Sequence, residues 1–148
     1  MRKLFSLRSN DAGSTIIEFA IIGPAFIALL IGVLQVGIGM QGYNAVRNIS
    51  SEVARETMIE YTTGNKISKS QIRSNAFSIG TSAPYLLDES LMNVAVWEPT
   101  DQRVDGATEY SIRIRYQVPM ILNFMGWNGP TVEHVRPIFV VDETPPTT

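Results

Sequence analysis

Residues 12–40 read AGSTIIEFAIIGPAFIALLIGVLQVGIGM, and this stretch decides how the chain is organised. No side chain between Phe19 and Leu34 is charged or strongly polar, and the whole apolar run covers about 25 residues. As a helix it would be about 35–40 Å long, which is enough to cross a hydrocarbon core of about 30 Å. We therefore predict a transmembrane helix over residues 14–42.

Glu18 stands near the start of this run, where a charge is costly. Hydrocarbon penalises a charged side chain by roughly 2.5–3.5 kcal/mol near the middle of a span, so an acid in such a segment indicates a functional site. A carboxylate at this depth needs a positive partner. If a protease cuts after Gly13, the new amine of Ser14 lies one helical turn from Glu18, and packed helices would pair the carboxylate of one subunit with the amine of its neighbour. The alternative is a carboxylate that reaches the membrane interface and has no role.

The flanks of the run predict its orientation. The charged residues before it are mainly basic, whereas basic and acidic residues are mixed after it, so the positive-inside rule places the N-terminus in the cytoplasm. The basic residues before the run are Arg2, Lys3 and Arg8. A cleaved secretory signal is disfavoured, because its apolar core would be only about 7–15 residues long and the nearest small-x-small site is Gly37-Ile38-Gly39.

Two further features lie inside the run. Gly23-Pro24 should bend the helix, because proline cannot donate a hydrogen bond to the carbonyl of Ala20 and its ring crowds that turn. Ala28 and Gly32 form a small-xxx-small step that would let another helix approach closely. The alternative is that small residues are simply common in such helices.

The N-terminal pattern resembles a known family. A basic leader that ends in glycine, four further residues, a glutamate and a long apolar helix form the pattern of prepilin-peptidase substrates, and residues 13–18 (GSTIIE) have it. Residues 18–22 (EFAII) followed by Pro24 resemble the TadE-like pseudopilins of the tight-adherence pilus system. Residues 53–56 (VARE) lie where the family has an alanine- and arginine-rich extension. The sequence departs from the family there, where the usual small apolar residues are replaced by Ser50, Ser51 and Thr57.

The resemblance implies a minor pilin that takes part in assembling or initiating a tight-adherence (Flp) pilus used in surface adhesion. Residues 1–13 would be a cytoplasmic leader removed by prepilin peptidase, Gly13 the residue that the peptidase recognises, and Glu18 the residue that sets subunit register. The implied partners are the peptidase, other pilin and pseudopilin subunits, the inner-membrane assembly platform and membrane lipid. The protein would cross the bacterial inner membrane once, with its C-terminal domain outside the cytoplasm and with entry into the pilus as a further option.

The alternative function is an uncleaved single-pass membrane protein whose outer domain binds a partner in the cell envelope. Processing at Gly13 separates the two hypotheses.

Composition limits the other classes. The 148-residue chain has a net charge of −2, which becomes −4 without residues 1–13, so it gives no support for nucleic-acid binding. Cysteine is absent, which excludes disulfides and thiol chemistry. We expect no enzyme and no cofactor, since the sequence has no phosphate loop or nucleophile elbow. His134 is the only histidine, and a calcium loop over residues 101–109 is disfavoured because Arg103 occupies a position that needs an oxygen ligand.

Residues 43–142 predict a small α+β domain outside the membrane. The anchor helix should continue through residues 43–61, with a buried stripe, and stop at Thr63-Gly64-Asn65. A second helix is expected over residues 68–79, and strands over 91–98, 110–118 and 132–141 form a three-stranded antiparallel sheet. Pro137 indicates an edge strand. The stripe consists of Val46, Ile49, Val53 and Thr57, and residues 143–148 are expected to be a disordered tail.

Two surfaces of this domain have open interpretations. Residues 119–127 crowd apolar side chains between two strands, and a short helix covering the sheet is the favoured reading. The sharper reading makes them a contact surface for the membrane or a neighbouring subunit, with Phe124 and Trp127 at its centre. Arg113 and Arg115 on the wet face of their strand would dock an acidic partner, although a solvated strand face is the commoner explanation.

Overall fold

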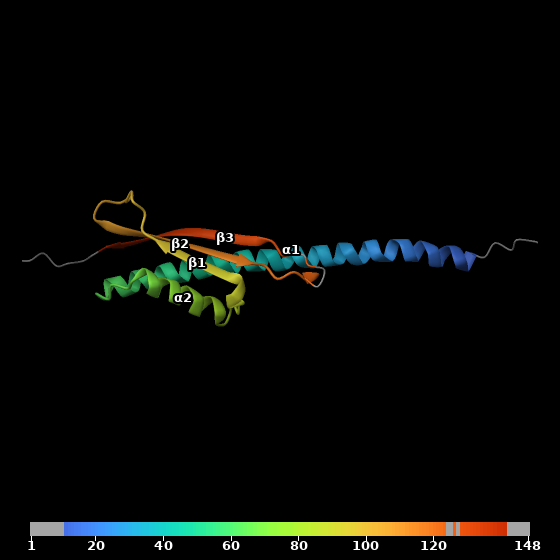
Figure 1. Ribbon diagram of the computed structural model, residues 1–148, viewed down its shortest axis with the longest axis horizontal. Coiled ribbons are helices and arrows are strands. Elements are labelled where there is room, and N and C mark those ends of the chain that lie inside the picture. The colour runs from blue at the N-terminus through green and yellow to red at the C-terminus, as the bar shows by residue number, and fades with distance from the viewer. Residues whose placement is uncertain (1–10, 124–125, 127, 142–148) are drawn as a thin grey trace, which may run out of the picture. The chain divides into compact units, whose positions relative to one another are not determined.

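The computed structural model describes residues 11–123, 126 and 128–141, and the chain divides into two compact units, Met1–Val36 and Gly37–Thr148. In the first unit the described residues form the N-terminal part of helix α1 (Asp11–Thr62). The second unit contains the rest of α1, helix α2 (Lys69–Thr81), the short 3₁₀ helix η1 (Glu89–Leu91) and strands β1 (Met92–Trp97), β2 (Ala107–Gln117) and β3 (Thr131–Val141) (Figure 1). The predicted α+β class is confirmed.

Some predictions fall on residues that lie outside the described part. The leader over residues 1–13 is described only from Asp11 onward. The predicted tail over residues 143–148 lies outside the described residues, and so do Phe124 and Trp127.

Helix α1 supplies one wall of the core in the second unit. The predicted stripe of Val46, Ile49, Val53 and Thr57 is fully buried, which confirms the helical periodicity read from the sequence. The helix ends where the sequence predicted. Gly64 has a positive φ of 84° and donates its N–H to Tyr61 O over 3.0 Å, and Asn65 donates to Glu60 O over 2.9 Å. This pair of bonds is a Schellman motif, which satisfies carbonyls that the end of a helix leaves unpaired.

Helix α2 begins at a capping box. Ser68 accepts a hydrogen bond from the N–H of Gln71, and the Gln71 side chain accepts one from the N–H of Ser68. Ile72, Ala76 and Gly80 are its buried residues. A Cβ atom on Gly80 would lie 2.9 Å from the sulfur of Met92, so glycine lets α2 pack closely on β1.

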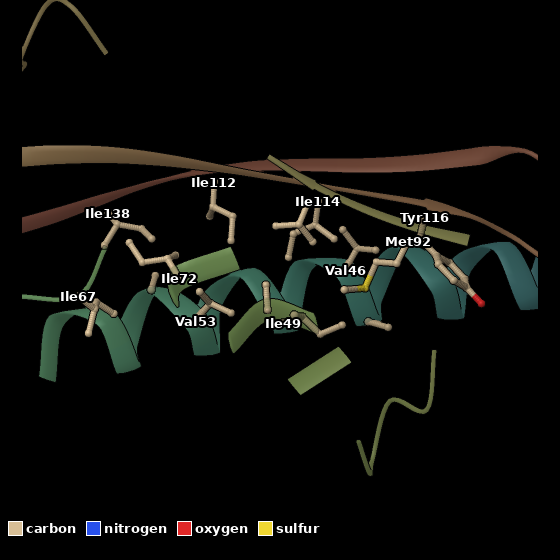
Figure 2. Close-up of a cluster of buried hydrophobic side chains, with 14 of the residues drawn as sticks. Val46, Ile49, Val53, Ile67, Ile72, Met92, Ile112, Ile114, Tyr116 and Ile138 are labelled. Atoms are coloured by element: carbon tan, nitrogen blue, oxygen red, sulfur yellow. The ribbon is translucent and has the colours of Figure 1, made fainter. Parts of the chain in front are cut away.

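The sheet is antiparallel with the order β1-β2-β3. The inward face predicted by alternation in β2 is confirmed, because Ile112, Ile114 and Tyr116 are buried on the face that packs against the helices. The alternation is not strict, since Ser111, which it assigns to the solvent face, is buried as well. Figure 2 shows them meeting the side chains of α1 and α2. Pro137 lies in β3, which is an edge strand, as its missing N–H predicted.

The connection between β2 and β3, where a short helix was favoured, is only partly described, because residues 124, 125 and 127 lie outside the described part. Asn123 has 3₁₀-helical conformation, and the N–H groups of Asn123 and Gly126 donate to Met120 O and Asn123 O. The backbone approaches itself closely at the base of the connection. Val118 donates to Pro130 O over 2.9 Å, and a Cβ atom on Gly129 would lie 1.8 Å from Val118 O. These contacts hold both ends of the connection against the sheet.

Candidate functional site

The Gly13 to Glu18 segment lies in the first turns of α1. Helix α1 begins at Asp11, so the Gly13–Ser14 peptide bond is part of the helix in the uncut chain. Ser14 and Glu18 are four residues apart, which places them on the same face of a helix one turn from each other. The Glu18 side chain is exposed.

Most apolar side chains of the first unit after Glu18 are exposed, and Ile31 is half-buried. Phe19, Phe26 and Leu30 have 76 %, 66 % and 50 % of their surface accessible. By length and composition, α1 is the one helix among the described residues that could cross a membrane, and its apolar window is not buried against other parts of the chain. An apolar surface of this size requires an apolar surrounding, which a bilayer or neighbouring helices supply.

Helix α1 also contains the residues predicted to bend the helix and to pack against another helix. Pro24 lies inside the helix, which is assigned as continuous through it, so the bend stays a prediction. Ala28 and Gly32 are both exposed, and no atom of the described residues beyond the helix backbone lies within 4 Å of the position that a Cβ atom on Gly32 would take. Their shared face is therefore open to another helix.

Arg113 and Arg115 are engaged with groups of the same sheet. Both form ion pairs with Glu133 on β3, Arg113 at 3.5 Å and Arg115 through its Nε, and the Arg113 guanidinium also lies 5.1 Å from the centre of the Trp97 ring. The hydrogen bond from Arg115, together with the positive charges of both arginines, lowers the pKa of Glu133. One carboxylate thus offsets part of the positive charge of these two arginines, for which docking of an acidic partner was the less favoured interpretation.

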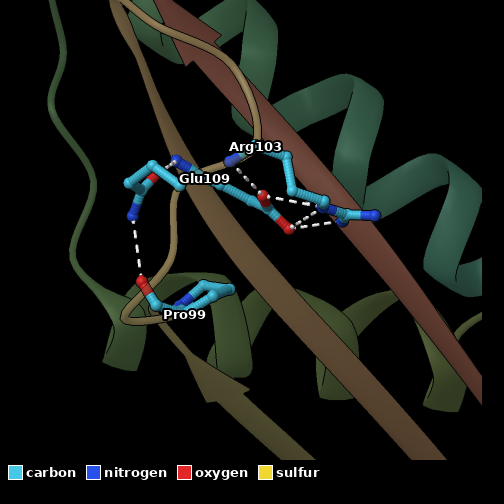
Figure 3. A network of polar contacts seen from close by, with 4 residues as sticks. Pro99, Arg103 and Glu109 are labelled. Atoms are coloured by element: carbon cyan, nitrogen blue, oxygen red, sulfur yellow. Dashed lines mark hydrogen bonds and ion pairs between the residues drawn. The ribbon is translucent and has the colours of Figure 1, made fainter.

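A buried carboxylate lies under the β1–β2 hairpin. Glu109 has only 1 % of its surface exposed, and its two carboxylate oxygens accept hydrogen bonds from Arg103 Nε at 3.0 Å and from Arg103 Nη2 (Figure 3). This hydrogen bonding lowers the pKa of Glu109. The backbone N–H of Glu109 donates to Gln102, which in turn donates to the carbonyl of Pro99. Arg103 therefore occupies the place where the sequence had hinted at a cation, and the network holds the hairpin closed.

His134 packs against an aromatic ring of α1. Its ring meets that of Tyr43 edge-on, with centroids 6.5 Å apart. Burial and the charges of Arg136 and Arg47 lower its pKa. Among residues 11–123, 126 and 128–141, no group of three or more His, Cys, Asp or Glu side chains is placed to hold a metal ion.

The sequence reasoning missed a cleft where α1 enters the second unit. It has a volume of about 410 Å³ and is lined by residues of α1, the loop before η1 and the end of β2. Its main sequence signal is the spacing of Gln41, Asn44 and Asn48, which puts three amides on one side of α1. The loop that completes it, around Leu86, has no such signal.

The TadE-like protein family model matches residues 13–55, which is less than a third of the chain. The match begins at Gly13 and confirms the resemblance read from the N-terminal pattern. No curated protein and no solved structure matches the chain.

Proposed function

We propose that this chain is a minor pilin of the tight-adherence pilus system, cut by prepilin peptidase after Gly13 and taking part in the assembly or initiation of the filament. The observation that carries the proposal is the spacing of Gly13 and Glu18 ahead of an apolar helix whose side chains are exposed. The match of residues 13–55 to the TadE-like family supports a part in that pilus system.

The cut would change the chemistry at the start of α1. A new positive amine would form at Ser14, at the N-terminal end of the helix. Transferring the Glu18 carboxylate into a bundle of apolar helices then costs less, because an amine of a neighbouring subunit offsets its charge. Since the helix rises about 1.5 Å per residue, pairing between neighbours fixes their displacement to within about one turn. Glu18 would in this way set the register of subunits.

The proposed location is the bacterial inner membrane, with the N-terminus in the cytoplasm and the second unit outside it. The basic residues before the apolar run support this orientation. The proposed partners are the peptidase, other pilin and pseudopilin subunits, and the membrane platform that assembles them. The competing hypothesis remains an uncleaved membrane protein whose outer domain binds an envelope partner.

Intact mass separates the two hypotheses. The chain is expressed in a host that carries a prepilin peptidase, extracted from the membrane and weighed, and we expect the mass of residues 14–148. Gly13→Val places a branched side chain at the cut and should leave the full-length mass. A wild-type chain that still begins at Met1 would overturn the minor-pilin proposal and favour the alternative.

The register role needs a second experiment, because processing and assembly are separate steps. Glu18→Gln keeps the shape of the side chain but removes its charge, so we expect normal cleavage and loss of incorporation into sheared filaments. Ile17→Ala, at an exposed neighbouring position, is the matched control and should be both cleaved and assembled. Equal assembly of Glu18→Gln and wild type would refute the register role and leave the processing result unaffected.

A further inference from the structure

The cleft at the start of the second unit joins three segments that are far apart in the sequence. Ile38, Gln41, Asn44 and Asn48 line it from α1, and Leu86 and Pro119 line it from the two loops beside the helix. None of the residues that line it is charged. The cleft therefore offers neutral amide and hydroxyl groups next to apolar side chains.

Leu86 is the most unusual residue at this cleft. It has 71 % of its surface exposed, and its backbone has a positive φ of 50°. Leucine rarely adopts the left-handed region, because its Cβ atom approaches the following carbonyl oxygen. A strained backbone that presents a large apolar side chain to solvent indicates a binding role, because folding alone gains little from it.

The cleft residues on α1 become more polar along the helix. Ile38 comes two residues after Val36 in the apolar run and packs against the core, and it is followed by the amides of Gln41, Asn44 and Asn48 at steps of three or four residues. Each step advances about 4.5–6 Å along a helix. This order, from apolar to neutral polar within about 15 Å, is the order of groups that a chain meets as it leaves the hydrocarbon of a bilayer.

From this placement we propose that the cleft and the Leu86 loop contact the interfacial layer of the membrane, with Leu86 entering it and the amides facing the ester and headgroup region of phospholipids. The inference rests on the membrane anchoring in the proposed function. The lack of charged groups at the cleft favours the neutral ester and glycerol groups that all phospholipids share over an anionic headgroup. Tyr85 and Tyr116, which also line the cleft, have the aromatic rings and hydroxyl groups that are enriched at this depth.

The chain has no cysteine, so single cysteines can carry a nitroxide label at chosen positions of the full-length protein in vesicles. Label positions are Leu86→Cys at the cleft, Phe26→Cys in the apolar run and Val104→Cys in the β1–β2 hairpin, and all three wild-type side chains are exposed. Val104 lies just before β2, and Val118 lies just after it and approaches Gly42 at the cleft. The length of β2, about 30 Å, therefore separates the label at residue 104 from the cleft. Accessibility to oxygen relative to a water-soluble nickel chelate reports the depth of each label.

We expect the oxygen-to-nickel ratio at residue 86 to lie between the high value at residue 26 and the low value at residue 104. The ratio should be the same in phosphatidylcholine vesicles and in vesicles with added phosphatidylglycerol. A value at residue 86 equal to that at residue 104, with residue 26 in lipid, would overturn this inference alone. A label at residue 26 that is open to water would overturn the membrane anchoring as well.

A nitroxide label at residue 86 is itself apolar and replaces the leucine side chain whose role is in question. A second measurement therefore places the label at another residue and leaves Leu86 in the reference protein. A label at Ala83→Cys, in the same exposed loop, is compared with and without Leu86→Asn. Asparagine tolerates a positive φ, so the variant should keep the fold while removing the apolar contact, and the label should become more accessible to nickel. No change on this substitution would overturn the role of Leu86. If the label is protected from nickel only at a high ratio of protein to lipid, the surface around Leu86 contacts a second copy of the chain. That result would overturn the lipid contact.

Discussion

Replacing Thr57 by valine should stabilise the second unit. Thr57 is fully buried on α1, and its hydroxyl oxygen has no hydrogen-bond partner among the described residues. Burying a hydroxyl group without a partner costs about 1–3 kcal/mol relative to a satisfied one. Valine has nearly the same shape, so it fills the same space without that penalty. We expect a gain in the free energy of unfolding of about 1 kcal/mol or more.

The gain is large enough to measure in a domain of this size. For a unit of about 100 residues, 1 kcal/mol raises the midpoint of thermal unfolding by about 4–8 °C. The full chain in detergent micelles can be melted while circular dichroism follows the loss of structure. Urea unfolding gives the free energy from the same signal, and an unchanged slope against urea would show that the unfolded state is the same.

Ser50 provides the matched control on the same helix. It is also fully buried, but its hydroxyl donates to the carbonyl of Arg47 over 2.8 Å. Ser50→Ala removes a satisfied group and should bring no gain, whereas Thr57→Ala opens a small cavity and should destabilise. A Thr57→Val variant that melts at or below the wild-type temperature would refute the reasoning, because the hydroxyl would then have a partner that stabilises it.

Two more variants test other contacts. Arg103→Gln removes the cation that holds the Glu109 carboxylate, and the hydrogen bond from Arg103 is the main cause of the lowered pKa of Glu109. The stability that the ion pair contributes should therefore be fully present above the unfolded-state pKa of about 4.3. It should be lost as the pH falls through the lower pKa of the folded state. The urea midpoint of the variant should therefore fall below that of wild type at pH 7, and the gap should narrow below about pH 4; a gap that is constant with pH would contradict the role of the pair. Gly129→Ala should destabilise by at least about 1–3 kcal/mol, because its Cβ atom would overlap the carbonyl of Val118. Gly64→Ala should cost only about 1 kcal/mol, because no other described residue lies near its Cβ position and the penalty comes from its positive φ alone. Equal thermal midpoints for these two variants would contradict the close approach at Gly129.

The features that the sequence predicted well depend on local periodicity. The shared face of Val46, Ile49 and Val53 can be predicted without knowing which segment covers it, because a helix places residues at this spacing on one side. The alternation of Ile112, Ile114 and Tyr116 works in the same way for a strand. The pattern from Gly13 to Glu18 is also local, which is why a resemblance could be drawn from it and why the family match begins at Gly13.

The features that the sequence did not predict depend on contacts between distant segments. Alternation assigns Glu109 to the solvent-exposed face of β2, yet its side chain is buried. The β1–β2 hairpin places Arg103 beside it, and the two side chains form an ion pair. The shared partner of Arg113 and Arg115 depends on the register that sets Arg115 opposite Glu133. The close approach of Gly129 to Val118, which brings the two ends of the β2–β3 connection together, has no signal in the local sequence.

Helix α1 is assigned as one element from Asp11 to Thr62, and its later turns supply Val46, Ile49 and Val53 to the core. Within the second unit these contacts lie along several turns of the same helix, so drawing α1 out of the domain would break many of them together instead of one at a time.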